Sequence, residues 1–98
     1  MDQAEVTITR HGTDRAGEYR AHVPGKTEIG RLTWVRHGNV RAAEHTLVPT
    51  AIGGRGVAMR LVEALVEDAR AGQFRIDPVC SYVAKAFERH PDWADLLA

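Results

Sequence analysis

The sequence is poor in cysteine, has no long apolar run and carries no excess charge of either sign. Its one cysteine, Cys80, cannot form an internal disulfide, so the chain needs no oxidising compartment. No apolar run approaches the roughly 20 residues that span a bilayer, and the opening Met-Asp-Gln-Ala-Glu lacks the basic and then apolar pattern of a signal peptide. From these absences we expect a cytoplasmic protein with no membrane partner.

Charge and metal-ligand patterns exclude two further classes of site. The 13 basic residues are matched by 13 acidic ones, and the arginines are scattered among acidic and apolar positions. Nucleic-acid binding draws most of its affinity from a basic surface, so we expect no nucleic-acid partner. The five histidines lack the spacing of a zinc site, and one cysteine cannot supplement them. No metal site is therefore predicted.

What the sequence does contain is typical of one small domain. Its 98 residues are 44% hydrophobic and 27% charged, which is enough to bury a single core without disulfides. It has no internal repeat, low-complexity tract or linker, so we predict a single domain over residues 1–98. The expected state is a monomer or a weak homodimer.

Alternating apolar and polar residues in the first half indicate four strands. The segments between them are short and carry turn residues: a loop over residues 11–17, Pro24-Gly25 in a type II turn, and a turn over residues 36–39. Short turns between successive strands predict an antiparallel meander. The expected strands are Glu5–Arg10, Glu18–Val23, Thr27–Arg36 and Val40–Val48.

The second half changes to the period of a helix. The expected elements are a helix with apolar residues from Ala58 to Ala69 and C-cap Gly72, a strand at Phe74 and Ile76, a helix from its cap Ser81 to about Arg89, and a last turn from Asp92. Because a whole helix precedes the fifth strand, that strand should lie parallel to an earlier one. The order ββββαβα predicts an α+β fold, with helices covering one mixed sheet.

The segment between the fourth strand and the first helix has the features of a phosphate site. Gly53, Gly54 and Gly56 let the backbone approach a ligand closely, and the first N–H groups of the helix carry a partial positive charge at the same point. A P-loop would need lysine and then serine or threonine after the last glycine, where this chain has valine and alanine. A dinucleotide fold would place the glycines after the first strand of a βαβ unit. A turn that only reverses the chain is the alternative.

Two side chains are candidates for chemistry beside that segment. Cys80 precedes a helix, whose dipole stabilises a thiolate, although a free cysteine also serves as a small buried hydrophobe. His45 lies near the end of the fourth strand, on one face with Ala43 and Leu47, where an imidazole suits a general base or a structural hydrogen bond. Ligands of open α/β sheets bind beyond the carboxyl ends of strands, so both side chains are expected near a crevice there.

Four groups of residues form an ordered set: His45-Thr46-x-Val48-Pro49, Gly54-Arg55-Gly56-Val57-Ala58 with Leu61-Val62, Pro78-x-Cys80-Ser81-Tyr82-Val83, and His90-Pro91-Asp92-Trp93. Over about residues 17–97, this set resembles the short, single-domain branch of the GNAT N-acetyltransferase superfamily. The resemblance implies a GNAT-like mixed sheet whose strands one to four are antiparallel and whose fifth strand is parallel to the fourth. One position departs, because the superfamily has arginine or glutamine where this chain has Gly53. That change removes a polar contact with the coenzyme and leaves the backbone cradle.

The resemblance also implies acetyl-CoA as the cosubstrate and an amine as the acceptor. The implied coenzyme-binding residues are Leu47, Val48, Gly53, Gly54, Arg55, Gly56, Val57, Ala58, Ser81 and Lys85, and the implied catalytic residues are Cys80 and His45. Either an amine attacks the thioester directly while a base such as His45 takes its proton, or the Cys80 thiolate accepts the acetyl group first. A short loop between the first two strands predicts an open acceptor side, which suits a small-molecule or a protein amine. A non-catalytic CoA-binding or regulatory module and an interaction domain are the alternatives.

Overall fold

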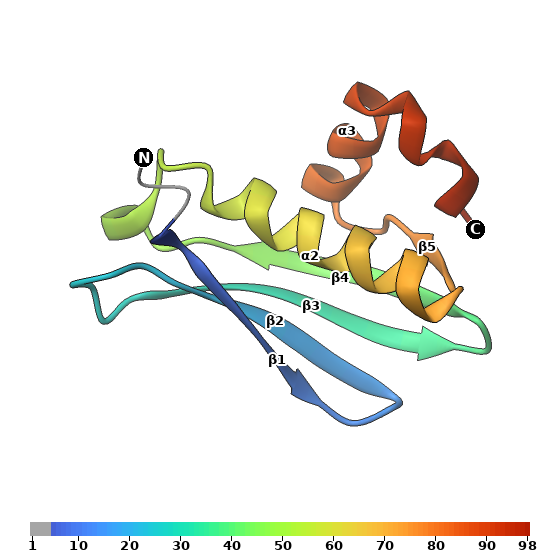
Figure 1. The fold of residues 1–98 in the computed structure, drawn as a ribbon, viewed down its shortest axis with the longest axis horizontal. Helices are drawn as coiled ribbons and strands as arrows, with labels where there is room; N and C mark the ends of the chain where they lie inside the picture. Colours follow the sequence, from blue (N-terminus) through green and yellow to red (C-terminus); the bar gives the residue numbers. More distant parts are fainter. Residues whose placement is uncertain (1–4) are drawn as a thin grey trace.

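Four strands from the first half and one from the second form a single mixed sheet (Figure 1). The computed structural model describes residues 5–98. The first four residues, which belong to the segment predicted to lack a signal-peptide pattern, lie outside the described range. The elements are β1 (Thr7–Gly12), β2 (Ala16–His22), β3 (Ile29–His37), β4 (Val40–Leu47), the 3₁₀ turn η1 (Thr50–Ile52), α2 (Val57–Gly72), β5 (Arg75–Asp77), α3 (Ser81–Arg89) and the 3₁₀ turn η2 (Pro91–Leu96). The predicted order ββββαβα is confirmed.

The strands pair in the order β1-β2-β3-β4-β5. The first four are antiparallel, and β5 is parallel to β4, so the predicted α+β mixed sheet is confirmed. The predicted turn at Pro24-Gly25 is present, since the Lys26 N–H donates to the Val23 carbonyl at 3.1 Å and Gly25 has φ 77°. Short connections thus set neighbouring pairs, as the sequence predicts.

The connection between β1 and β2 is shorter than predicted. In place of a loop over residues 11–17, β1 runs to Gly12 and β2 begins at Ala16, with Gly12 paired to Gly17. A Cβ at Gly17 would lie 2.3 Å from the His11 carbonyl oxygen, so only glycine permits this approach. The residues expected to form the loop instead extend the β1–β2 pairing almost to the end of the hairpin. The expectation of a seven-residue loop is therefore wrong.

Two predicted helix caps are also wrong. Gly72 is the last residue of α2, and the left-handed cap is Gln73 at φ 57°. A Cβ at Gly72 would lie 3.1 Å from the Phe74 ring, so this glycine makes room for the ring. Ser81 is the first residue of α3, and Cys80 is the N-cap because its N–H donates to the Ala43 carbonyl at 2.8 Å and holds it extended beside β4.

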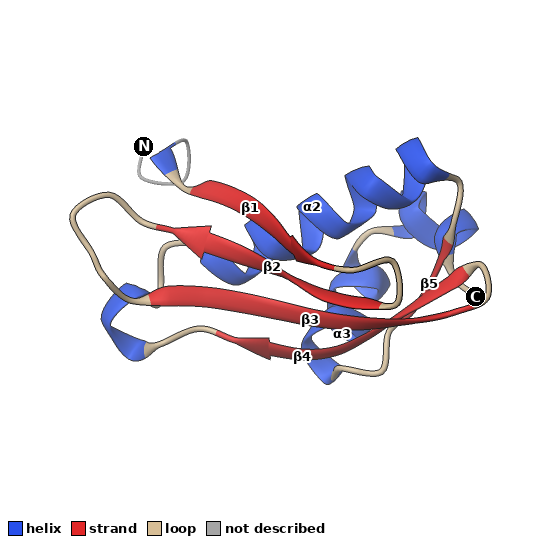
Figure 2. Cartoon of the chain, turned by 90° about the horizontal axis from the view of Figure 1, so that it is seen from below, coloured by secondary structure: helices blue, strands red, loops and turns tan. Residues whose placement is uncertain are grey.

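Both helices lie on one face of the sheet (Figures 1 and 2). The apolar face of α2 packs on β1, β2 and β3, while α3 packs on α2 and β4. The core on this face includes Tyr19, Ala21, Leu32, Trp34 and Ala43 from the sheet, Leu61, Val62, Leu65 and Ala69 from α2, and Val83 and Phe87 from α3. The opposite face carries charged and polar side chains, which an antiparallel sheet can present to water.

The C-terminal turn packs through aromatic rings. The Trp93 ring stacks on His90 with centroids 4.0 Å apart and meets Phe87 edge-on at 5.4 Å. The His90 Nδ1 lies 2.8 Å from the Ala86 carbonyl oxygen. The group His90-Pro91-Asp92-Trp93 therefore fixes the end of the chain against α3.

Candidate functional site

The glycine-rich segment lies between the end of β4 and the start of α2. After Pro49 the chain forms η1, whose residue Ile52 is fully buried in the core. Gly53 is extended, and Gly54 and Gly56 adopt left-handed φ values of 74° and 73°. The sequence predicted a proline and a glycine-rich phosphate-binding turn here, but not the 3₁₀ turn η1. Its residue Ile52 is buried directly before the first of the glycines.

Within residues 5–98, no side chain caps the backbone N–H groups at the start of α2. The N-cap is Gly56, which has no side chain to accept from them, and the first turn contains no acidic residue. A Cβ built at Gly54 would meet no atom of the described residues within 4 Å, so this side of the turn is open. Uncapped N–H groups, the helix dipole and free space suit a phosphate group.

The edge of β4 becomes free as it approaches this turn. The strand β5 pairs with β4 only from Val40 to Ala42 and ends at Asp77, while β4 continues to Leu47. Within the described chain, the next contact to that edge is the hydrogen bond from Cys80 to Ala43. Leu47 is 60% exposed. The two strands therefore separate as predicted, and the free edge can pair with an extended ligand.

Cys80 lies where the two strands separate. It is half-buried, and its Sγ hydrogen-bonds with the Thr46 Oγ1 at 3.4 Å. Burial raises the pKa of the Cys80 thiol. The Thr46 hydroxyl, two backbone N–H groups at the start of α3 and the backbone N–H of Thr46 together lower that pKa by more, so it lies below its ordinary value. Thr46 belongs to a motif that sequence reasoning quoted, but its contact with the thiol was not predicted.

We expect this environment to be measurable as a pH profile of alkylation. Because the pKa of Cys80 is lowered, the rate of its reaction with iodoacetamide should reach half its plateau at lower pH than that of a free cysteine. Thr46→Val keeps the side-chain shape and removes the hydroxyl, so its midpoint should move to higher pH. A Thr46→Val midpoint equal to the wild-type one would contradict this role of Thr46.

His45 points away from Cys80, contrary to the predicted alternation. The register pairs Thr33 with His45 but Trp34 with Ala43, so Glu44 is an extra residue in a β-bulge. Ala43 is fully buried on the helix-covered face, and His45 is exposed on the open face. The expectation that these two residues share a face is wrong. His45 shares its face with Leu47, and its role as a base stays a prediction.

The remaining residues predicted to contact the coenzyme differ in how exposed they are. Val57 is buried, and its Cγ1 lies 3.0 Å from where a Gly30 Cβ would stand, so only its backbone faces the turn. Ser81 and Lys85 are exposed on α3, one turn apart. Val48, Arg55 and Ala58 are partly buried around the turn. Their contacts with a coenzyme stay predictions.

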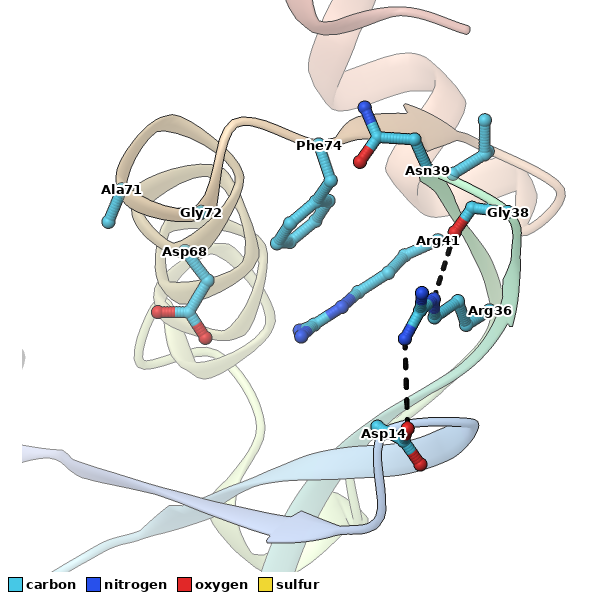
Figure 3. A pocket seen from close by; sticks show the side chains of 10 residues that line it. Asp14, Arg36, Gly38, Asn39, Arg41, Asp68, Ala71, Gly72 and Phe74 are labelled. Atoms are coloured by element: carbon cyan, nitrogen blue, oxygen red, sulfur yellow. Dashed lines mark hydrogen bonds and ion pairs between the residues drawn. The ribbon is translucent and has the colours of Figure 1, made fainter.

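A cavity lies at another place on the molecule. Its volume is about 410 Å³, and its walls come from the β3–β4 turn and the C-terminal end of α2 (Figure 3). The glycine turn is at the other end of that helix. A ligand that pairs with a strand edge and a helix start needs no enclosed cavity, so this cavity does not argue against the site at the glycine turn.

The described residues contain neither a cluster of metal ligands nor a helix that could span a membrane. Among residues 5–98, no three histidine, cysteine, aspartate or glutamate side chains gather as metal ligands. Over the same range, every helix is too short or too polar to cross a bilayer.

Comparison with known families gives a match over most of the chain. The sequence model of the family described as GCN5-related N-acetyl-transferase matches residues 18–96. The matched range contains the glycine turn, the separating strands and Cys80.

Proposed function

We propose, because this chain belongs to the GCN5-related N-acetyltransferase family, that it transfers an acetyl group from acetyl-CoA to an amine. Membership gives acetyltransferase activity in general, and the donor and the amine are our proposal. The observation that supports it best is the continuity of three parts. A free strand edge on β4 lies between an open helix start and a thiol of lowered pKa.

The residues present fit acetyl-CoA. The pyrophosphate would lie on the backbone N–H groups from Gly54 to Ala58, where the first turn of α2 has no acidic side chain to repel it. The pantetheine amides would pair with Leu47 and Val48 on the free edge. Lys85 would meet a coenzyme phosphate. Gly53 offers no side chain, so this position contributes only backbone.

In the proposed reaction the amine nitrogen bonds to the thioester carbon while the carbon–sulfur bond breaks. The amine proton passes to a base, and coenzyme A leaves as the thiol. His45 on the open face would take that proton, directly or through water, as the amine approaches from the face that no helix covers. Transfer through an acetyl-Cys80 thioester is the second route.

A CoA-binding module without catalysis is the second candidate function. One observation favours it: Gly53 stands where the superfamily has an arginine or glutamine side chain. Such a module would use the glycine turn and would need neither His45 nor Cys80.

The deciding experiment measures binding and turnover on one sample. Acetyl-CoA at 100 times its Kd should stabilise the folded protein by about 2.7 kcal/mol, seen as a rise in Tm, and coenzyme A should be measured beside it. Thiol release with a panel of amines then distinguishes the enzyme from the module. A shift without thiol release for any amine favours the module, and no shift with either ligand contradicts both.

The same assay on Cys80→Ala separates the two routes. Direct transfer predicts full turnover in this variant and no acetyl adduct of the wild-type protein by intact mass. The acetyl-Cys80 route predicts an adduct of wild type that is absent from Cys80→Ala, together with loss of turnover.

A further inference from the structure

The cavity of about 410 Å³ contains two arginines, of which only Arg36 has a carboxylate within ion-pair distance among the described residues. Arg36 and Arg41 are direct cross-strand partners on β3 and β4, and both side chains extend into the cavity (Figure 3). Like charges directly opposite each other in an antiparallel pair are destabilising. This arrangement therefore calls for a counter-charge.

Arg41 is held rigidly in this cavity. Its Cζ lies 3.9 Å from the centroid of the Trp34 ring and 4.2 Å from that of Phe74. Its Nη1 donates a hydrogen bond to the Tyr19 hydroxyl at 2.9 Å. This is the hydrogen bond that the guanidinium makes within residues 5–98. The guanidinium therefore packs against two aromatic rings, and its other N–H groups can bind a further acceptor.

Of the two carboxylates that line the cavity, Asp68 binds other residues and Asp14 pairs only with Arg36. Asp68 accepts from the Arg10 Nε at 2.9 and 3.1 Å and from the Tyr19 hydroxyl at 2.9 Å. Asp14 lies 3.8 Å from the Arg36 Nη1, and both of these side chains are exposed. Among residues 5–98, no carboxylate lies within ion-pair distance of Arg41. A half-buried cation without a counter-ion is unusual in a folded protein.

On the open face of the same sheet, a carboxylate lies between a second cross-strand pair of arginines. Arg20 and Arg31 are also cross-strand partners, and the Glu18 carboxylate bridges them, 3.2 Å from the Arg31 Nε and in a close ion pair with Arg20. The pair in the cavity has no such bridge within the described chain. Arg36 instead donates to the Gly38 carbonyl at 2.9 Å and forms an exposed ion pair with Asp14, and no carboxylate of the described chain joins it to Arg41.

We propose that the cavity binds a small organic monocarboxylate whose oxygens bridge Arg36 and Arg41, as Glu18 bridges the other pair. Guanidinium forks match a carboxylate in bidentate geometry. Phe74, Val40 and Ala71 form the apolar part of the wall and would contact the body of the ligand. Asp14 and Asp68 add negative charge that disfavours a dianion such as phosphate. This site is separate from the glycine turn and does not depend on the proposed function.

The test is an amide NMR titration of the full chain with sodium hexanoate and sodium benzoate, and separately with inorganic phosphate. Saturable shifts are expected at the amides of Asn39, Val40 and Gly72 with the carboxylates. Arg36→Gln should weaken binding about tenfold or more. Asp14→Asn should tighten it, because a carboxylate competing for Arg36 is removed. Arg31→Gln, on the open face, is the matched control and should bind like wild type.

Several outcomes would overturn the proposal. These are the absence of saturable shifts at those amides, equal affinity of wild type and Arg36→Gln, or tighter binding of phosphate than of either carboxylate. Repeating the titration with saturating acetyl-CoA separates the two sites. Carboxylate shifts that vanish there would place the ligand at the start of α2 instead. If the protein does not bind acetyl-CoA at all, the titration with carboxylates still tests the cavity, because the two sites are separate.

Discussion

Replacing Ala58 with glutamate should weaken acetyl-CoA binding by about tenfold or more while leaving the fold intact. Ala58 is the second residue of α2, where the proposed site places the pyrophosphate. A carboxylate there repels the phosphates at close range in a partly buried setting. The same charge favours the helix dipole by about 0.3–1 kcal/mol, so the unfolding free energy should stay level or rise. Affinity and stability would move in opposite directions.

Ala58→Gln is the matched control for this change. It has the size of glutamate without the charge, so it should retain most of the affinity and separate repulsion from steric blocking. Isothermal titration with acetyl-CoA gives the Kd of each variant, and thermal unfolding without ligand gives its stability. Equal affinity of Ala58→Glu and Ala58→Gln would show that no phosphate lies at this helix start.

Local patterns in the sequence were sufficient to predict the order of the strands and the pairing of neighbouring strands, although not the length of the β1–β2 connection. Period-two alternation with short turns set the meander, and the change to helical spacing after the glycines set α2 and the parallel β5. Leu61, Val62 and Leu65, expected on the apolar face, are all fully buried. These features depend on neighbours in the sequence, which is why sequence reasoning reached them.

The errors arose where one residue or one distant contact decides the geometry. The bulge at Glu44 reverses the faces of the residues after it, and the alternation of His45, Thr46 and Leu47 reads the same with or without a bulge. Cys80 rather than Ser81 caps α3 because of a hydrogen bond to β4, 37 positions earlier at Ala43. No local pattern contains such information.

The same reason explains what was missed altogether. The group around Arg41 joins Tyr19, Trp34, Asp68 and Phe74, which lie on β2, β3, α2 and the segment after it. Each residue alone fits a strand or helix pattern. Burial and the charge of Asp68 raise the pKa of Tyr19, so its hydroxyl remains protonated and donates to Asp68 while accepting from Arg41. Only the folded chain brings these groups together.

Truncating Ile52 should test whether the core holds the glycine turn in place. The side chain is fully buried in η1, directly before Gly53, so Ile52→Ala removes packed atoms and leaves a cavity. We expect a loss of about 2–5 kcal/mol in unfolding free energy, which is a large share of the stability of a small domain. Ile52→Val removes one methylene and should lose about 0.5–1.5 kcal/mol.

The affinity for acetyl-CoA distinguishes an anchor from a mere core residue. If Ile52 positions the turn, then Ile52→Ala should bind acetyl-CoA more weakly than wild type even at temperatures where it is fully folded, because the N–H groups of Gly54 and Gly56 lose their fixed position. Val79→Ala, at a side chain that is 58% exposed, is the control and should change the unfolding free energy by less than about 0.5 kcal/mol. Urea unfolding and calorimetric titration measure both quantities. An Ile52→Ala protein that loses stability but keeps wild-type affinity would mean that the backbone dihedrals at the glycines hold the turn without help from the core.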